Sequence, residues 1–383
     1  MFLEKVMERN PKLLDAAIKL HQEGILDPDT YILDVPSLLE NAKLVLDEAK
    51  KHGLNCLYMS KQIGRNAEIA ELLEDMGYDG AVAVDYREAL HLAAHGLKLW
   101  NVGHLVQTPK SVLERLIPYG VRYFTIYSID KLQEIDEIAK RHDIHQSIMV
   151  KVADDSCLIY DGQQGGFNLD ELECIVEAAK KLSHIQIEGV TSFPCMLYNE
   201  KSKKIEKTAN FDLLLKAKER LESLGCAIKE VNTPSSNTYA SMKLAADNHA
   251  TTVEPGHALT GTTPYHAFHS DGEVPTLLYL TEISHMVNGT SYAYGGGYYR
   301  RSNLKNALVV HRDGVRERAL IHGPSIDSID YTLKIDGVHP VSATVLCSFR
   351  TQIFTTRSHV ALIDPRGEEP VLLGVFDAHG YKL

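Results

Sequence analysis

The sequence lacks the features that mark membrane, secreted and nucleic-acid-binding proteins. None of its apolar runs is long enough to span a bilayer. The opening residues, MFLEKVMERNPKLL, carry charges where a secretory signal needs an apolar block. Positive charge is also scarce, because 40 Lys and Arg stand against 51 Asp and Glu, a net charge of −11. Such a chain does not attract a phosphate backbone, so we expect neither nucleic acid nor membrane as a partner.

Paired cysteines and a dinucleotide fingerprint are missing as well. The six cysteines are scattered and form no CxxC, so reduced thiols in a cytoplasmic protein are expected. No GxGxxG follows the first strand-like run of the repeating pattern described below, which argues against a dinucleotide-binding sheet.

The composition that is present predicts a large folded core. The chain has 383 residues, 44% hydrophobic and 24% charged, which indicates two domains or one with an appendage. Residues 1–30 are predicted to be helical, with Asn10 as a cap before Pro11. A short strand at 31–35 and a helix at 37–51, ended by Gly53, follow.

From residue 54 onward, strand-like runs alternate with amphipathic helical stretches. The runs are 54–61, 80–85, 98–103, 123–128, 147–153, 187–193, 227–232 and 250–254. This alternation predicts an α/β fold, a (β/α)8 TIM barrel over residues 31–272. A doubly wound open sheet is the alternative that counting leaves open.

In a barrel of this kind, chemistry belongs at the carboxyl ends of the strands. Lys61 follows the first run, and burial there would lower the pKa of its amine and favour Schiff-base formation. A solvated surface lysine is the alternative. The other strand ends carry Asp85, His104, Lys151, Ser192, Asn232, Ser235, Ser236, Glu254, Gly256 and His257. Serine hydroxyls and the Gly256 backbone suit a phosphate, although TPSSNT also fits a plain polar loop.

The last part of the chain, residues 273–383, is predicted to be a mainly β domain. Its strand-like runs are 277–287, 307–311, 318–322, 343–348, 351–356, 359–363 and 371–376. Three consecutive glycines, Gly295 to Gly297, stand among tyrosines. They indicate a loop shaped around a ligand or another subunit, or else a β-bulge.

Taken together, these motifs resemble the fold-type III pyridoxal-phosphate enzymes, which include alanine racemase and the ornithine and diaminopimelate decarboxylases. The chain is most similar to the YhfX-like proteins of that group, nearly end to end. The resemblance is carried by YMSKQIGRN, VAVDYREA, GHLVQ, EPGHALTGT, EISH, YAYGGGYYRR, SIDYTL and FRTQIFTTRS.

The resemblance implies pyridoxal 5'-phosphate as the cofactor, bound covalently by Lys61. Glu254 matches the decarboxylase glutamate that faces the pyridine nitrogen, where alanine racemase has an arginine. Tyr294 matches a racemase tyrosine that acts from the second subunit, so a homodimer with shared active sites is expected. The remaining cofactor-binding residues implied are His104, Ser192, Ser235, Ser236, Gly256 and His257, with Asp327 and Gln164 toward the substrate.

At several positions the sequence differs from these relatives, and each difference argues against one of their activities or substrate pockets. Ile326 stands where the decarboxylases have an acidic cysteine, and isoleucine cannot donate a proton. Gln164 begins QGGF in place of the racemase RLGF, and Ser192 stands in TSF in place of THF. His339 and Cys347 are too widely spaced for the His and Cys pair of the metal-assisted lyases, so no metal is expected.

We therefore expect an enzyme that acts at Cα of a small amino-acid substrate, first of all an amino-acid racemase. A pyridoxal-phosphate-dependent decarboxylase or lyase is the alternative of the same class. A non-catalytic pyridoxal-phosphate-binding protein is the alternative from another class.

Overall fold

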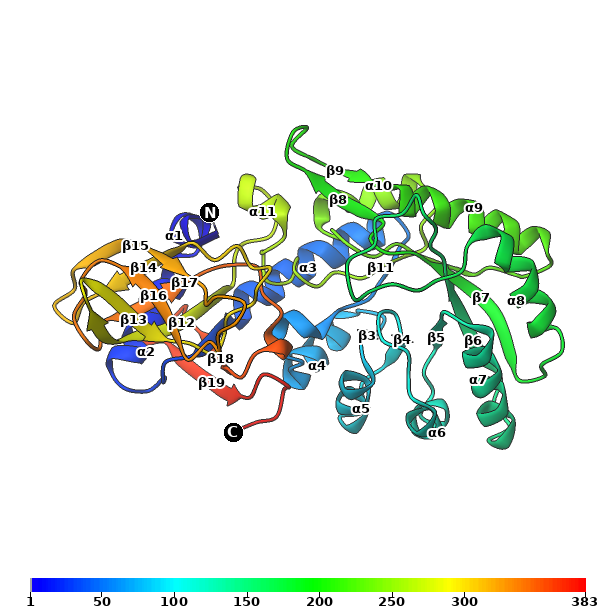
Figure 1. Cartoon of the computed structure of the whole chain (residues 1–383), viewed down its shortest axis with the longest axis horizontal. Helices are drawn as coiled ribbons and strands as arrows, with labels where there is room; N and C mark the ends of the chain where they lie inside the picture. Colours follow the sequence, from blue (N-terminus) through cyan, green and yellow to red (C-terminus); the bar gives the residue numbers. More distant parts are fainter. Residues whose placement is uncertain (1) are drawn as a thin grey trace. The chain divides into compact units, whose positions relative to one another are not determined.

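The computed structural model describes residues 2–383. The chain divides into two compact units, each treated separately below (Figure 1). The barrel unit comprises Lys43–Ser60 and Ala70–Gly256, and the β unit comprises the chain up to Ala42, Lys61–Ile69 and His257–Leu383.

The barrel unit is built on an eight-stranded parallel sheet in the order β2-β11-β10-β7-β6-β5-β4-β3. Its strands are β2 (Asn55–Cys56), β3 (Ala81–Ala83), β4 (Leu99–Val102), β5 (Tyr123–Ile126), β6 (Gln146–Lys151), β7 (Ile185–Thr191), β10 (Glu230–Asn232) and β11 (Thr252–Val253). A parallel bridge between Tyr58 and Ala81 links the two ends of this order. The predicted TIM-barrel class is confirmed, and the open-sheet alternative is wrong.

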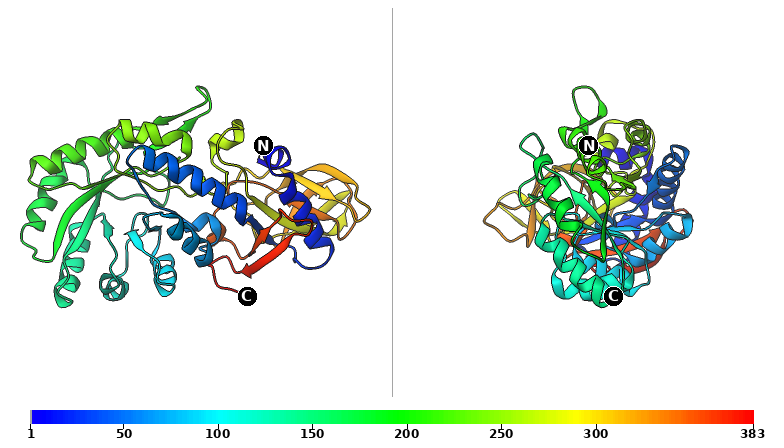
Figure 2. Two further views of the ribbon diagram at one scale, coloured as in Figure 1. Left: turned by 180° about the vertical axis from the view of Figure 1, so that it is seen from behind. Right: turned by 90° about the vertical axis from the view of Figure 1, so that its right-hand side faces the viewer.

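Helices follow most of these strands and stand on the outer side of the sheet (Figure 2). They are α4 (Ala67–Met76), α5 (Tyr86–Ala94), α6 (Lys110–Tyr119), α7 (Ile129–Arg141), α8 (Leu172–Ala179), α9 (Ala209–Ser223) and α10 (Met242–Asp247), with the 3-10 turns η2 (Leu169–Glu171) and η3 (Tyr239–Ser241). Asp85 caps α5 by accepting from the Arg87 and Glu88 backbone N–H groups at 2.9 Å. A hairpin of β8 (Met196–Asn199) and β9 (Lys204–Lys207) was not expected from the sequence.

The β unit holds a nine-stranded sheet in the order β13-β16-β15-β14-β17-β12-β1-β18-β19. Its strands are β1 (Thr30–Asp34), β12 (Leu277–Val287), β13 (Thr290–Tyr294), β14 (Asn306–Val310), β15 (Arg316–His322), β16 (Thr332–Asp336), β17 (Thr344–Cys347), β18 (His359–Asp364) and β19 (Val371–Phe376). Although β1 precedes the barrel in sequence, it pairs antiparallel with β12 and parallel with β18.

Helices from the start of the chain cover one face of this sheet. In α2 (Pro11–Gln22), which follows α1 (Phe2–Arg9), Asn10 accepts from the Leu13 N–H as the predicted cap. Buried Leu13 and Ala17 join a core cluster with Leu278 and Leu346 of the sheet. The remaining elements are α3 (Val35–Lys51), η1 (Ser60–Ile63), α11 (Pro264–Phe268) and η4 (Ile353–Thr355).

The strand predicted at 351–356 is wrong, because η4 occupies this stretch. Thr355 Oγ1 donates to the Gln352 carbonyl at 2.9 Å and Thr356 Oγ1 donates to the Ile353 carbonyl at 2.7 Å. Threonine hydroxyls that bond nearby carbonyls favour a turn over an extended ladder. Strands β13 and β16 were missed by the sequence prediction.

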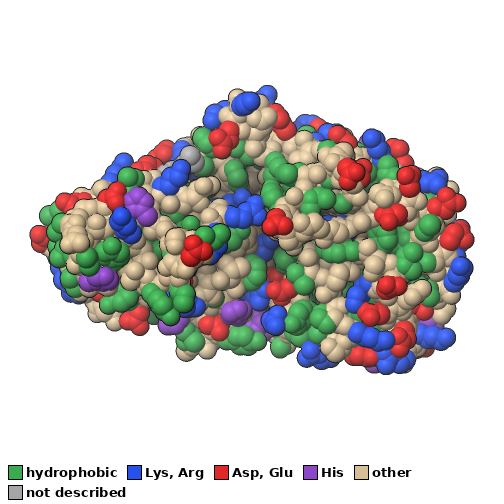
Figure 3. Space-filling view, viewed as in Figure 1, with side chains coloured by type: hydrophobic (Ala, Val, Ile, Leu, Met, Phe, Trp, Pro, Cys, Tyr) green, Lys and Arg blue, Asp and Glu red, His purple; other side chains and the backbone are tan. Residues whose placement is uncertain are grey.

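In the part of the chain that the structure describes, no helix combines the length and apolarity needed to cross a membrane. On the visible face of the barrel unit, acidic and basic side chains are interspersed (Figure 3).

Candidate active site

The parallel strands bring polar side chains together at one end of the barrel unit. His104 follows β4, Lys151 ends β6, Ser192 follows β7, Asn232 ends β10 and Glu254 follows β11. All five are buried, with exposed fractions between 0% and 3%. The sequence analysis had placed these residues at strand ends. A parallel barrel brings the carboxyl ends of its strands together at the same end.

Two asparagines contact Glu254, one at its carboxylate and one at its backbone. Its Oε1 accepts a hydrogen bond from Asn232 Nδ2 at 2.7 Å, and its backbone N–H donates to Asn237 Oδ1 at 3.0 Å. The carboxylate also contributes, after burial, to raising the pKa of the neighbouring Cys195 thiol. An oriented, buried carboxylate is suited to holding a proton on a ligand nitrogen.

The loop that follows β10 is wound in an uncommon conformation. Ser235 and Ser236 have φ of +86° and +49°, in the left-handed region that L-residues other than Asn and Asp rarely adopt. Asn237 closes this loop, because its Nδ2 donates to the Thr233 carbonyl at 3.1 Å. Backbone in such a conformation costs free energy and persists only where surrounding contacts hold it. Such residues are found often at ligand sites.

His104 and Ser192 are fixed by the surrounding barrel. The His104 ring packs edge-to-face on Phe193 at 5.6 Å between centroids, and its carbonyl accepts from the Tyr127 hydroxyl. Ser192 Oγ donates to the Val152 carbonyl at 2.8 Å. That hydroxyl therefore ties β7 to the segment after β6.

Lys151 is a functional candidate that the sequence placed at a strand end without assigning it a role. Its Nζ lies 4.5 Å from the centre of the Tyr127 ring and 3.4 Å from the Gln163 carbonyl. Burial lowers the pKa of this amine to about 8. The signal available in sequence was a lysine directly after the apolar run Ile148 to Val150.

Gln164 lies in an exposed loop of the barrel unit, where its Nε2 donates to Asp161 Oδ1 at 3.3 Å. The next residue, Gly165, has φ of +125°, and a Cβ there would lie 2.7 Å from the Tyr127 ring. The glycine pair of QGGF therefore lets this loop approach the aromatic ring that also contacts Lys151.

The chain just before Lys61 is anchored within the barrel unit. Met59 N–H donates to the Pro255 carbonyl at 3.0 Å, and Ser60 Oγ donates to Glu88 Oε1 at 2.6 Å. Glu88 is fully buried and was not singled out in the sequence. These contacts fix the backbone from which Lys61, in η1, projects.

Within the β unit, Lys61 and His257 form part of one electrostatic cluster. Burial, then the charges of Arg350 and Lys61, hold the pKa of His257 well below its usual range. The ring is therefore neutral near pH 7. Gln352 Nε2 lies 3.4 Å from His257 Nε2 and Thr262 Oγ1 lies 3.3 Å from Nδ1, which fits a tautomer that carries its proton on Nδ1.

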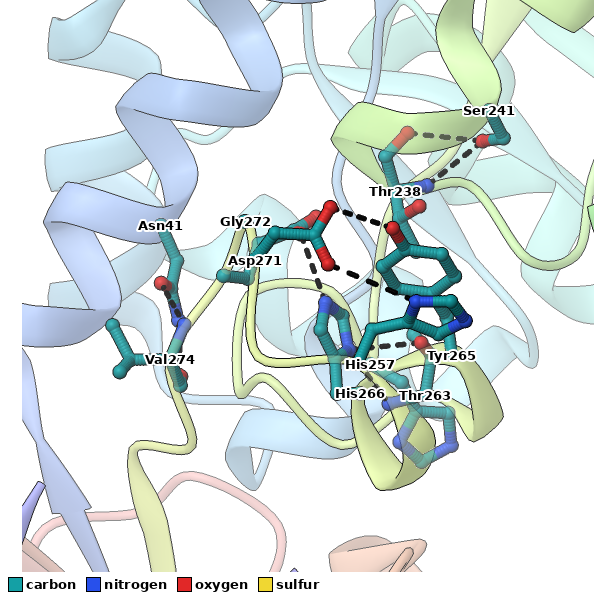
Figure 4. Close-up of polar contacts among 12 residues, drawn as sticks. Asn41, Thr238, Ser241, His257, Thr263, Tyr265, His266, Asp271, Gly272 and Val274 are labelled. Carbon is teal, nitrogen blue, oxygen red and sulfur yellow. Dashed lines mark hydrogen bonds and ion pairs between the residues drawn. The ribbon is translucent and has the colours of Figure 1, made fainter. Parts of the chain in front are cut away.

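A buried hydrogen-bond network supports the segment that follows His257 (Figure 4). Thr262 N–H donates to the His257 carbonyl at 2.9 Å. The Thr263 N–H donates to His266 Nδ1 at 3.3 Å, so Nε2 of that ring carries the proton facing Glu273 at 2.8 Å. The His266 and Glu273 side chains are completely buried, and the pair fixes this turn from inside.

Tyr294 ends β13 and its side chain is 43% exposed. Its backbone carbonyl accepts a hydrogen bond from Thr281 Oγ1 at 2.7 Å. The glycines that follow fit against the β unit's own chain. A Cβ on Gly296 would lie 1.8 Å from Asp29 Oδ2, and one on Gly297 would lie 2.2 Å from the Tyr279 ring.

Asp327 lies in an exposed loop between β15 and β16. Arg300 donates to the carbonyl of the preceding Ile326 at 3.0 Å. Ile326 and Ile329 are 75% and 61% exposed, so the loop presents Asp327 between apolar side chains.

Comparisons with known proteins identify the fold and the family of this chain. Residues 33–264 match the alanine racemase N-terminal domain, and residues 278–369 match the YhfX-like C-terminal domain. Solved structures with the same fold include alanine racemase of Clostridium difficile 630, with a TM-score of 0.63, 18% identity, 92% of this chain and 98% of that chain covered. D-threonine aldolase from Filomicrobium marinum has a TM-score of 0.65 and 14% identity, with 84% and 86% covered. D-threo-3-hydroxyaspartate dehydratase from Delftia sp. HT23 has a TM-score of 0.65 and 14% identity, with 91% and 97% covered.

The fold is thus that of the alanine-racemase-like, pyridoxal-phosphate-dependent proteins, a barrel followed by a β domain. The chain belongs to the YhfX-like family. It is 39% identical to the uncharacterized protein YhfX of Escherichia coli K12 over 386 residues, with both chains covered completely.

The donor set at the barrel mouth fits the cofactor that this family implies. A phosphate needs hydroxyl and N–H donors, which Ser235 and Ser236 supply from half-buried positions. A pyridine nitrogen needs an acceptor for its proton, which the oriented carboxylate of Glu254 supplies.

Proposed function

We propose that this protein is a pyridoxal-phosphate-dependent enzyme that acts at Cα of an amino acid, and that its reaction is racemisation. The observation that carries the proposal is the Glu254 carboxylate, which is 2% exposed and accepts a hydrogen bond from Asn232, while Asn237 holds the Glu254 backbone N–H. When bound, pyridoxal phosphate supplies an electron sink that makes a Cα proton acidic. A carboxylate that keeps a proton on the ring nitrogen strengthens that sink.

In this proposal each side chain has a separate task. Lys61 binds the cofactor covalently and moves the Cα proton on one face of the substrate. Tyr294, from a second subunit, holds the proton that is returned on the other face. Ser235, Ser236 and the backbone at Gly256 and His257 bind the phosphate, while His104 and Ser192 line the cofactor. Asp327 and Gln164 face the substrate.

A lyase acting on a β-hydroxy amino acid is the second candidate. Two of the structures that share this fold are named for such chemistry, a threonine aldolase and a hydroxyaspartate dehydratase, with TM-scores of 0.65 each. A decarboxylase is less favoured, because Ile326 stands where the similar decarboxylases have a proton-donating cysteine. A cofactor carrier without turnover is disfavoured by the β domain, because its residues Tyr294 and Asp327 are suited to act on a substrate.

The test is exchange of Cα protons into heavy water across a panel of L- and D-amino acids. An enzyme of the proposed kind exchanges the Cα proton and interconverts the two enantiomers. A lyase releases a carbonyl product from a β-hydroxy substrate, and a carrier exchanges nothing above the rate of free pyridoxal phosphate. Absence of exchange with every amino acid in cofactor-loaded protein would reject the enzyme proposal.

A further inference from the structure

Three potential metal ligands meet at one edge of the β unit, outside the groups assigned to the cofactor. Glu317 Oε2 lies 3.0 Å from His339 Nδ1 and 3.3 Å from His311 Nε2. The three atoms all lie within 4.8 Å of one another. In a tetrahedral zinc site with bonds near 2.0 Å, ligand atoms are about 3.3 Å apart. The observed separations from Glu317 therefore match such a site.

The register of the sheet positions these ligands. Glu317 lies in β15, opposite Val309 of β14, and His311 directly follows β14. The neighbours Arg316 and Arg318 form ion pairs with Asp15 and Glu4 of the covering helices. Because side chains alternate along a strand, Glu317 projects to the opposite side, toward His339.

His339 is held by contacts that select one protonation pattern. Its Nε2 lies 3.1 Å from the Asp336 carbonyl, and a carbonyl only accepts, so Nε2 carries the proton. Its backbone N–H donates to Ser291 Oγ at 2.9 Å, and the side chain is only 7% exposed. In a neutral ring, Nδ1 then turns a lone pair toward the Glu317 carboxylate. A second ring proton or a cation must lie between them.

Of these two alternatives, the environment of His311 favours a cation. Its Nε2 is covered by protein, and among the described residues it makes no hydrogen bond, although Glu317 Oε2 is 3.3 Å away. An ion pair with His339 would satisfy one ring and leave this second nitrogen unused. One metal ion would bind all three atoms. The His339 bond to a backbone carbonyl is also the usual support of a metal-ligating imidazole.

We propose that His311, Glu317 and His339 form a binding site for one divalent transition-metal ion, with Zn²⁺ as the best geometric match. Two imidazoles and a carboxylate leave the fourth tetrahedral position for water. The ion would join the β14–β15 hairpin to the turn after β16. This proposal departs from the sequence-based expectation that no metal binds, and it does not depend on the proposed amino-acid chemistry.

The experiment is calorimetric titration of Zn²⁺ into the untagged, full-length, cofactor-loaded protein after treatment with a chelator. We expect one saturable site per chain with micromolar or tighter affinity. Glu317→Gln and His339→Gln should each weaken binding roughly a hundredfold or more, since even loss of a supporting contact costs 10- to 100-fold. His285→Gln, a change in β12 of the same sheet, is the matched control and should bind as wild type.

Thermal unfolding gives the second readout. Zn²⁺ should raise the Tm of wild type and of His285→Gln, and should leave that of Glu317→Gln unchanged, because only the native site gains ligand binding energy. Glu317 is 45% exposed, so this variant should fold even if His339→Gln does not. Wild type without a saturable site, or a Glu317→Gln variant that binds like wild type, would show that the cluster is only a histidine–carboxylate ion pair.

Discussion

Single side chains carry the chemistry proposed for this protein, and Lys61 is the first of them to test. Lys61→Ala removes the only group assigned to covalent attachment, so the protein should lose the absorption band of a lysine-linked pyridoxal phosphate. Borohydride reduction followed by peptide mass spectrometry should place the cofactor on Lys61 in wild type. Lys140→Met serves as the control, since it removes an exposed amine of α7. A retained band in Lys61→Ala would move the attachment elsewhere.

Glu254 can be neutralised without changing its shape. Glu254→Gln keeps an oxygen for the hydrogen bond from Asn232 but removes the negative charge. We expect Cα proton exchange to slow by roughly 10²-fold while the cofactor remains bound, as for loss of one preorganised electrostatic group. The matched control is Glu230→Gln, a buried carboxylate that accepts from Trp100 Nε1 at 2.8 Å. Loss of cofactor from Glu254→Gln would make this residue an anchor instead.

Lys151 should leave a signature in the pH dependence of stability. Burial lowers its pKa from 10.5 to about 8 in the folded chain, so between these values the unfolded state binds more protons. The free energy of unfolding therefore rises with pH across this window, by about 3 kcal/mol from this group. Urea unfolding of wild type and Lys151→Met, compared at each pH, should show the rise only in wild type. Lys140→Met, on the exposed side of α7, should follow wild type.

At the scale of elements, the glycine run after β13 is a steric requirement of the β unit. Gly296→Ala would place a Cβ 1.8 Å from Asp29 Oδ2 at a φ of +132°, and we expect it to destabilise the protein by about 3 kcal/mol or more. Gly289→Ala is the control, because its φ of +77° is also positive but nothing lies within 4 Å. That change should cost only about 1 kcal/mol in urea unfolding. Equal costs would show that backbone strain, and not the approach to Asp29, requires glycine.

The elements most visible in the sequence are those with continuous apolar runs. The run from Ile148 to Val150 in β6 is fully buried, and such runs located the barrel strands. Strand β16 was missed although Leu333 and Ile335 alternate with polar residues, because one five-residue alternation is a weak signal. The β8–β9 hairpin was missed because the apolar run of β8, Met196 to Tyr198, is only three residues long and β9 is mostly exposed and charged.

The residues of the candidate site likewise fall into those that the sequence could locate and those that it could not. Strand ends such as Ser192 and Glu254 could be located because a parallel barrel converts strand order into a ring of side chains. The partners that orient them could not, since the Asn237 bond to Glu254 depends on loop conformation. The His311, Glu317 and His339 cluster was also invisible, because the register of β14 and β15 and a turn after β16 bring it together.

For the whole molecule, the main prediction concerns an active site shared between two subunits. Lys61→Ala and Tyr294→Phe should each be inactive in racemisation, because each lacks the base for one face of Cα. Mixing them and allowing subunit exchange should restore about a quarter of wild-type activity, since half of the dimers are mixed and each has one intact site. No recovery after demonstrated exchange would argue against a shared site, and full activity of Tyr294→Phe would remove its role as a base.

The position of β1 has a consequence for how the protein is made. This strand leaves the ribosome early, yet its neighbours in the sheet are β12 and β18, which are synthesised after the whole barrel. The barrel strands all lie between residues 55 and 253, so they can pair while the chain is still growing, whereas β1 must wait. Until then its backbone N–H and C=O groups lack their sheet partners and Tyr31, Ile32 and Leu33, which are buried in the folded chain, stay exposed, so the growing chain is prone to aggregate through this segment.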